Sequence, residues 1–152
     1  MQLILLRHGE AERQTQTDEL RMLTARGQQQ ASQMCSQLLA KVRPSRFLVS
    51  PLLRAQQTLA PLRRALPHVP VDVIEHIKPD DSARIALDVL SGYSDDCIVV
   101  VCHMNIIASL GGLLLAEPPE SFDLAEARCY DLAVIAAGLG QERWRLTPHF
   151  EQ

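Results

Sequence analysis

Continuous apolar runs, rather than alternating ones, give the two strongest strand signals in this chain. The first covers residues 3–6 and leads into Arg7 and His8, and the second covers residues 97–102 and leads into His103. Runs of this kind are typical of parallel strands that are covered on both faces. Shorter apolar segments predict further strands at residues 46–50, 71–74, 129–135 and 142–146, the last two joined through a turn at Gly138 and Gly140.

Helical spacing of apolar residues predicts helices between these strands. Thr24 is a suitable N-cap for the first helix, which ends before Pro44. Its inward face carries Ala31, Met34, Cys35, Leu38, Leu39 and Val42. Ser50-Pro51 is a suitable N-cap and first-turn pair for the second helix, and Pro61 should kink or divide that helix. Its inward face carries Leu52, Ala55, Leu59, Leu62 and Leu66.

Two more helices follow the same reasoning. The third begins at Asp80-Asp81-Ser82 and is closed by Gly92. Its inward residues are Ile85, Ala86, Val89 and Leu90. The fourth extends over residues 105–115 and is loosened by Gly111-Gly112. The polar stretch from Glu10 to Arg21 has no periodicity and is expected to form a loop over the site.

The alternation of strands and helices predicts the fold class. It reads β-α-β-α-β-α-β-α-β-β, which favours a three-layer α/β/α arrangement around a mostly parallel central sheet. A length of 152 residues is enough to bury a sizeable core. We therefore expect one domain over residues 1–152.

Composition and charge exclude several functional classes. The chain is 47% hydrophobic and 22% charged, and its net charge of −3 without a Lys/Arg block gives no nucleic-acid footprint. No apolar stretch reaches the roughly 20 residues that span a bilayer, and no signal-peptide pattern opens the chain, so we expect a cytoplasmic protein without membrane contact. Four cysteines without a C-x-x-C pair favour buried thiols over disulfides or a metal site: Cys35, Cys97, Cys102 and Cys129.

Three strand-to-helix junctions carry the candidate chemistry. Arg7-His8 follows the first strand, Arg54 lies one turn into the second helix, and His103 follows the fourth strand. Parallel strands present their carboxyl ends at one edge of the sheet, so these side chains should meet there beside two helix N-termini. Cations, imidazoles and helix N-termini suit a dianion such as a phosphoryl group, and Gly9 lets the backbone approach it.

Several motifs resemble the histidine phosphatase superfamily, which has the phosphoglycerate mutase-like fold. They are Arg7-His8-Gly9, Leu23-Thr24-Ala25-Arg26-Gly27, Ser50-Pro51-Leu52-Leu53-Arg54-Ala55-Gln56-Gln57-Thr58, and the strand that ends in His103. The short chain and Asp18-Glu19-Leu20-Arg21 ahead of Leu23 are most similar to the SixA-type phosphohistidine phosphatases. Met22 departs from that subgroup, which tends to have proline there, and this difference concerns the loop more than the chemistry.

The resemblance implies that His8 attacks phosphorus and carries the phosphoryl group as a covalent phosphohistidine, which water then hydrolyses. Arg7 and Arg54 would hold the phosphoryl oxygens, and His103 would donate a hydrogen bond or charge to them. Because these cations supply the charge compensation, we expect no metal ion and no cofactor. Asp18 and Arg21 are further candidates for contact with the substrate.

The proton donor to the leaving group stays open between two carboxylates. Glu75 follows the third strand, where many family members place an acid, and Asp18 lies in the loop. An imidazole leaving group is protonated easily, so a phosphohistidine substrate would depend little on either acid.

The short segment between Arg54 and His103 predicts an open site, which suits a phosphoprotein better than an enclosed metabolite. We therefore expect dephosphorylation of phosphohistidine on a protein. The alternatives are a small-molecule phosphomonoesterase or mutase of the same superfamily, and a non-catalytic phosphoprotein-binding module. The presence of a nucleophile at His8 argues against the binding module. The sequence sets no oligomeric state.

Overall fold

A six-stranded sheet forms the centre of the computed structural model, which describes residues 1–13 and 17–149. Its strands are β1 (Gln2–Arg7), β2 (Arg46–Val49), β3 (Val71–Val73), β4 (Cys97–Cys102), β5 (Ala127–Asp131) and β6 (Gln141–Leu146). They lie in the order β3-β2-β4-β1-β5-β6. The four on the β3 side pair in parallel, whereas β5 and β6 are antiparallel to their neighbours. The predicted α/β class is confirmed.

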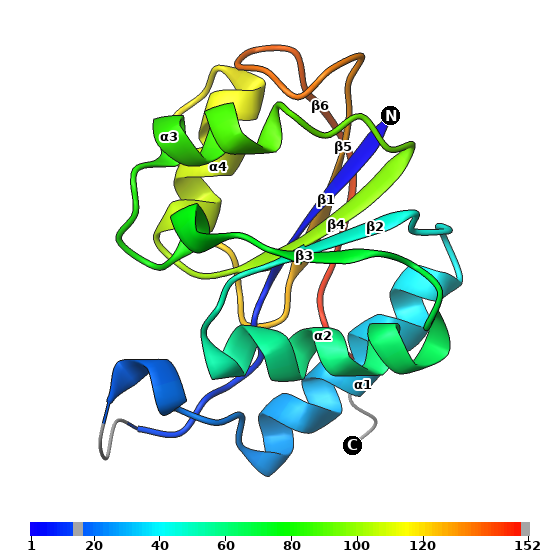
Figure 1. The fold of residues 1–152 in the computed structure, drawn as a ribbon, viewed down its shortest axis with the longest axis vertical. Helices are drawn as coiled ribbons and strands as arrows, with labels where there is room; N and C mark the ends of the chain where they lie inside the picture. The colour runs from blue at the N-terminus through cyan, green and yellow to red at the C-terminus, as the bar shows by residue number, and fades with distance from the viewer. Residues whose placement is uncertain (14–16, 150–152) are drawn as a thin grey trace.

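Within the described residues, four α-helices cover the two faces of this sheet (Figure 1). They are α1 (Ala25–Leu39), α2 (Leu53–Ala65), α3 (Ala83–Leu90) and α4 (Ile106–Leu115), with short 3-10 helices η1 (Asp18–Leu20) and η2 (Glu75–Ile77). Helices α1 and α2 pack on one face, and α3 and α4 pack on the other. The three layers predicted from the sequence are therefore present.

The continuous apolar runs are explained by burial on both faces of the central strands. In β1, Leu3 and Leu5 enter the core beneath α3 and α4, whereas Ile4 and Leu6 enter the core beneath α1 and α2. All six residues of β4 are buried. The outer strand β6 instead alternates between exposed and half-buried residues, as expected for an edge strand with one face toward solvent.

The start of the second helix differs from the prediction. Helix α2 begins at Leu53, with Leu52 as its N-cap, and not at Ser50-Pro51. The Ser50 hydroxyl is fully buried and lies 2.6 Å from His103, so a tertiary contact uses the group that was assigned to capping. The helix is also not divided at Pro61, which lies inside it. One missing N–H is offset there by the packing of the buried face of the helix.

Other boundaries and faces also differ. Helix α1 ends at Leu39, and Val42 is buried from the loop that follows it. Ile85 is 56% exposed, because the buried face of α3 is formed by Ala86, Leu87 and Leu90. Strand β5 begins two residues before the predicted start at Cys129 and ends at Asp131. Helix α4 continues through Gly111, and a Cβ there would lie 2.8 Å from the Tyr130 hydroxyl, so close packing favours glycine at this position.

The polar stretch after β1 contains more structure than a loop. A single antiparallel bridge pairs Ala11 with Leu23, and η1 forms at residues 18–20. The part of this predicted loop at residues 14–16 lies outside the described residues. In the part described, η1 packs against α2. The stretch is therefore attached to the helix that carries Arg54.

Two expectations about composition can be compared directly with the structure. In residues 1–13 and 17–149, no helix is long and apolar enough to cross a membrane. The four cysteines are all free, and three of them are buried. The prediction of thiols rather than disulfides is therefore confirmed.

Close backbone contact joins the site loop to the start of α1. Thr24 caps this helix, with its hydroxyl accepting from the Gly27 N–H at 3.0 Å. A Cβ at Gly27 would lie 2.0 Å from the Glu10 carbonyl oxygen, and a Cβ at Gly9 would lie 2.7 Å from the Gly27 carbonyl oxygen. Only glycine permits this approach, which places α1 directly behind the residues that follow His8.

We expect Gly27→Ala to lower the free energy of unfolding by about 1–3 kcal/mol, because the added Cβ collides with backbone. Helix propensity alone would favour alanine, so the sign of the change separates the two effects. Urea unfolding measures it. Gly92→Ala is the control, since the nearest atom to its Cβ would be 3.5 Å away, and it should change stability by less than about 0.5 kcal/mol. Equal effects of the two substitutions would contradict this account.

Candidate functional site

The carboxyl ends of β1 and β4 bring two histidines together. Arg7 lies opposite Cys102 in the parallel register, and the His8 N–H donates to the Cys102 carbonyl at 3.1 Å. His8 and His103 therefore leave neighbouring strands at the same level. The centroids of their rings are 5.1 Å apart, and the ring planes are tilted by 54°. The prediction that these strand ends meet is confirmed.

The hydrogen bond of His8 determines which ring nitrogen carries the proton in the neutral form. Its Nδ1 atom lies 2.6 Å from the Gly9 carbonyl oxygen. A carbonyl can only accept, so Nδ1 carries the proton and Nε2 keeps its lone pair in the neutral ring. His8 is 8% exposed, which shields the lone pair from most of the solvent. This arrangement suits a nucleophilic imidazole.

The second imidazole is held by a serine from the end of β2. His103 Nε2 lies 2.6 Å from the Ser50 hydroxyl oxygen, and that oxygen also accepts from the Leu52 N–H at 3.3 Å. The serine hydroxyl can then donate to Nε2, which leaves the proton of a neutral ring on Nδ1. His103 Nδ1 is buried and has no hydrogen-bond partner within the described residues.

Arg54 from the first turn of α2 is almost entirely buried, at 3% exposure. Its guanidinium donates to the Asp18 carbonyl from Nη1 at 2.8 Å and to the Asp18 carboxylate from Nη2 at 3.2 Å. Burial lowers the pKa of Arg54, whereas the charge and hydrogen bond of Asp18 raise it in part. The contact fixes the orientation of the guanidinium through η1.

Arg7 is oriented by backbone from the far end of the chain. Its Nη1 donates to the Phe122 carbonyl at 2.7 Å. Burial lowers the pKa of Arg7, and the charges of Asp123 and Glu126 raise it in part. The guanidinium thus lies between a carbonyl that fixes it and carboxylates that favour its charged form.

Three buried nitrogens of these residues share one property. Among the residues that the structure describes, the buried side-chain nitrogens and oxygens without a hydrogen-bond partner are Arg7 Nε, Arg54 Nε and His103 Nδ1. Leaving a buried donor without a partner costs about 1–3 kcal/mol, and more for a charged group. All three belong to side chains that the sequence assigned to phosphoryl binding. Such donors are suited to the oxygens of an oxyanion.

Burial and positive charge keep both imidazoles neutral. The pKa of His8 is lowered to about 4: burial is the largest cause, the hydrogen bond to Gly9 opposes it, and the charges of Arg54, Arg7 and Arg21 add to the lowering. For His103, burial again acts first and the neighbouring His8 second, and its pKa falls to about 3. Both rings are therefore neutral near pH 7, with a proton on only one of their two nitrogens.

Asp18 and Arg21 lie beside Arg54. Arg21 Nη1 is 3.0 Å from Asp18 Oδ1, and Arg21 Nε donates to the Glu12 carbonyl at 2.8 Å. Burial alone would raise the pKa of Asp18, but the hydrogen bonds and charges of Arg21 and Arg54 outweigh it, and the pKa is lowered. Asp18 is therefore an anion that pairs with arginines.

Gly9 was expected to let the backbone approach a phosphoryl group. Its N–H donates to the Thr58 hydroxyl at 3.0 Å, and that hydroxyl donates to the Arg54 carbonyl at 2.8 Å. The need for glycine comes from the contact with Gly27 described above. Contact between Gly9 and a phosphoryl group stays a prediction.

Glu75 lies at the start of η2, and its side chain is 69% exposed. Its carboxylate is 3.8 Å from Lys78 Nζ. The ion pairs found in residues 1–13 and 17–149 do not join Glu75 to any of the two histidines or two arginines of the site. Its assignment as an acid stays a prediction.

Sequence reasoning missed three groups that orient the site. Thr58 and Ser50 both lie inside the motif of residues 50–58. Arg54 and Thr58 are four residues apart, which places these two side chains one helical turn from each other. This spacing was a usable signal for Thr58. The Phe122 carbonyl had no signal, because every residue type has the same carbonyl.

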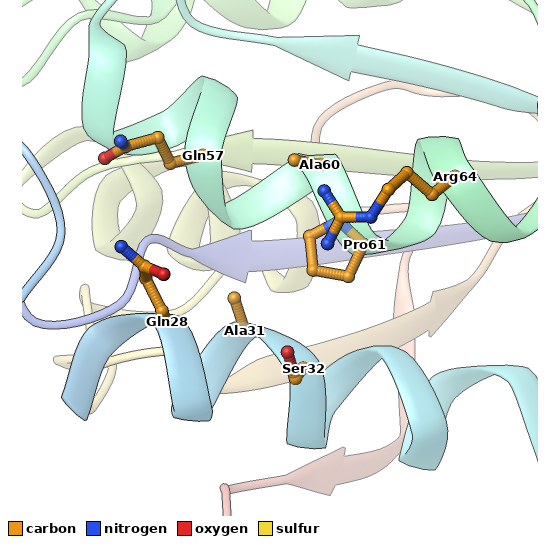
Figure 2. A pocket seen from close by; sticks show the side chains of 7 residues that line it. All are labelled: Gln28, Ala31, Ser32, Gln57, Ala60, Pro61 and Arg64. Atoms are coloured by element: carbon orange, nitrogen blue, oxygen red, sulfur yellow. The ribbon is translucent and has the colours of Figure 1, made fainter. Parts of the chain in front are cut away.

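The hollow between α1 and α2 lies outside this constellation. Figure 2 shows its lining, which includes Gln28, Gln57, Pro61 and Arg64, and it has a volume of about 220 Å³. None of the predicted site residues lines it. In the described part of the chain, no three His, Cys, Asp or Glu side chains are grouped so that they could hold a metal ion.

Comparison with known proteins identifies relatives along the chain. Phosphohistidine phosphatase SixA from Escherichia coli K12 is 28% identical over 155 residues, which cover 97% of this chain and 94% of that protein. A SixA homolog from Haemophilus influenzae is 30% identical over 122 residues, covering 72% and 74% of the two chains. A solved structure of the protein histidine phosphatase SixA complexed with tungstate has a TM-score of 0.86 at 28% identity, with 97% of each chain covered.

More distant structures share the fold alone. The α-ribazole phosphatase from Shigella flexneri has a TM-score of 0.73 at 21% identity and covers 93% of this chain and 96% of its own. At the level of family, residues 3–78 match the model of the histidine phosphatase superfamily (branch 1), and this segment includes Arg7, His8 and Arg54. This chain therefore belongs to the histidine phosphatase superfamily.

Proposed function

We propose that this chain is a phosphohistidine phosphatase that removes the phosphoryl group from phosphohistidine on a protein, through a covalent intermediate on His8. One observation carries the proposal: the buried donors without a partner are confined, among the described residues, to Arg7, Arg54 and His103 around that imidazole. The similarity to SixA from Escherichia coli over 97% of the chain supports the same substrate.

In the first step, the lone pair on His8 Nε2 attacks phosphorus. A P–N bond forms to His8 while the P–N bond to the substrate imidazole breaks, and the bond electrons leave with that imidazole, which takes up a proton. In the second step, water attacks the phosphorylated His8, and phosphate is released. A covalent intermediate divides one difficult displacement into two easier ones.

The arginines and His103 would act on the phosphoryl oxygens. Arg7 Nε, Arg54 Nε and His103 Nδ1 are the donors available for those oxygens, on which charge is concentrated as the group is transferred. They are already oriented by the Phe122 carbonyl, Asp18 and Ser50, so binding requires little rearrangement. We propose that this set of cations allows turnover without a metal ion.

The leaving group requires little help with its proton. Asp18 is held as an anion by its arginines, so at neutral pH it has no proton to donate. Glu75 is exposed, and its carboxylate lies 3.8 Å from Lys78 Nζ, as in a surface ion pair. A leaving imidazole is basic enough to take its proton from water, which makes an essential acid unnecessary.

We further propose a phosphorylated protein as the partner, with a cytoplasmic location. The tungstate-bound relative is a protein histidine phosphatase, which supports a protein substrate. A small-molecule phosphomonoesterase or mutase is the alternative that a substrate panel tests. Turnover of sugar phosphates without action on a histidine-phosphorylated protein would overturn the proposal.

We expect His8→Ala to abolish turnover of a histidine-phosphorylated protein, because no other group supplies the nucleophile. Rapid quenching of the wild type with radiolabelled substrate should trap acid-labile label on the enzyme, and the variant should trap none. The melting temperature should stay close to that of the wild type.

His76→Ala is the matched control, since His76 is an exposed histidine in η2, and it should keep both turnover and label. Binding of the phosphoprotein without any trapped label in the wild type would favour a non-catalytic binding module instead.

We expect Arg54→Ala to weaken tungstate binding by about 10- to 100-fold, because one charge-assisted hydrogen bond contributes about 1.5–3 kcal/mol. Isothermal titration calorimetry measures the dissociation constant. Arg64→Ala removes an exposed arginine from the same helix and should leave the affinity unchanged. An unchanged affinity in Arg54→Ala would exclude Arg54 from oxyanion binding.

Stability should fall as the pH is lowered from 7 to 5. The pKa values of His8 and His103, about 4 and about 3, are below the ordinary value of 6.5. Between about pH 6.5 and pH 4 the unfolded chain binds protons that the folded protein does not. The free energy of unfolding therefore decreases as the pH is lowered. The stability that the two neutral imidazoles contribute is complete above pH 6.5 and fully lost only below about pH 3.

Urea unfolding at pH 7, 6 and 5 measures this change, with on the order of 1–2 kcal/mol expected per imidazole over the range. His103→Gln should flatten the dependence, because one of the two shifted groups is removed. A steeper dependence in that variant, or greater stability of the wild type at pH 5, would contradict the neutral state of the rings.

A further inference from the structure

The segment of residues 120–126, between α4 and β5, contacts the end of β1 through its backbone. The Phe122 carbonyl accepts from Arg7 Nη1 at 2.7 Å, and the Glu126 carbonyl accepts from the Arg7 N–H at 3.0 Å. The Ala125 N–H donates to the His8 carbonyl at 3.0 Å. The position of this segment therefore determines where the Arg7 guanidinium lies relative to His8.

A second set of contacts joins the same segment to Arg128 on β5. Arg128 Nη2 donates to the Ser121 carbonyl at 2.6 Å, and Nη1 donates to the Glu120 carbonyl at 3.3 Å. Its Cζ atom lies 3.8 Å from the centre of the Phe122 ring. One guanidinium thus contacts the two residues before Phe122 and the ring of Phe122 itself.

Glu126 completes this arrangement. Its Oε2 accepts from Arg128 Nε at 2.6 Å, and its Oε1 accepts from the Asp123 N–H at 2.8 Å. Both side chains of the Arg128–Glu126 pair are 4% exposed. Backbone groups on both sides of Phe122 are therefore held by one buried ion pair.

Stability alone is a poor explanation for such a pair. The loss of solvation of two buried charges offsets most of their attraction, and apolar side chains of similar volume would often serve as well. The planar guanidinium offers something that apolar groups lack, since its donors have fixed directions toward two carbonyls and a carboxylate. The pair therefore specifies the position of the backbone around Phe122.

We propose that Arg128 and Glu126 are positioning residues for oxyanion binding. They hold the Phe122 carbonyl against Arg7 Nη1, and this contact keeps Arg7 Nε available for the oxygens of the bound phosphoryl group. Neither residue contacts the substrate, so both act through Arg7. The inference rests on the oxyanion-binding role of Arg7 in the proposed function.

A double-mutant cycle with tungstate as the probe tests this proposal. The dissociation constant is measured by isothermal titration calorimetry for the wild type, Arg128→Lys, Arg7→Ala and the double variant. Arg128→Lys keeps the charge opposite Glu126 but loses the fork that holds the carbonyls. We expect it to weaken tungstate binding about tenfold in the wild type and less than about twofold in the Arg7→Ala background.

Glu126→Gln provides a second variant for the same cycle. Glutamine keeps the volume and an acceptor for the Asp123 N–H, and it removes a charge that pairs with Arg128 and also favours the charged form of Arg7. We expect a smaller loss of tungstate affinity than in Arg128→Lys, again absent in the Arg7→Ala background. Urea unfolding of each variant shows that the protein measured is folded, and Glu126→Gln carries the test if Arg128→Lys does not fold.

Arg143→Lys is the matched control, because Arg143 of β6 forms an exposed ion pair with Asp131 of β5, the strand that carries Arg128. It should leave tungstate affinity unchanged. Equal weakening by Arg128→Lys in both backgrounds would reduce Arg128 to a structural residue and overturn the inference, as would unchanged affinity in the folded single variant. Absence of tungstate binding by the wild type would overturn the proposed function as well, so the two failures are distinguishable.

Discussion

The parallel pairing of β1 with β4 is the interaction on which the rest of the site depends. It places Arg7 opposite Cys102 and joins the His8 N–H to the Cys102 carbonyl, so two histidines leave the sheet side by side. Both strands are buried on both faces, between helices that pack from opposite sides. The strands that carry the histidines are therefore held from both sides by hydrophobic cores.

The site brings together groups that repel one another when charged. The buried guanidinium of Arg54 and the half-buried one of Arg7 lie near two imidazoles. The structure limits the repulsion by keeping both rings neutral and by pairing Arg54 with Asp18. This leaves buried donors without partners, which is unfavourable for folding. An oxyanion would satisfy these donors and compensate the charge, so the destabilising arrangement and the proposed function have the same origin.

Sequence reasoning predicted the strands and the meeting of their ends well, because apolar runs and strand-end residues are local signals. It was wrong about Ser50, which resembles a helix cap but contacts His103. Of the two outcomes predicted for Pro61, division of the helix does not occur, because Pro61 lies inside α2. Local rules describe what a residue favours when nothing else competes for it. In both places, tertiary packing decided the outcome.

The sequence by itself determined the layers, which strands are buried on both faces, and the residue types gathered at one edge of the sheet. Hydrophobic periodicity is a property of the chain, and it carries this information. Only the tertiary structure decided how those residues are oriented. Arg54 is fixed by Asp18, 36 residues away, and Arg7 by the Phe122 carbonyl, 115 residues away. A backbone carbonyl is the same for every residue type, so the sequence carries no sign of which one a distant arginine will contact.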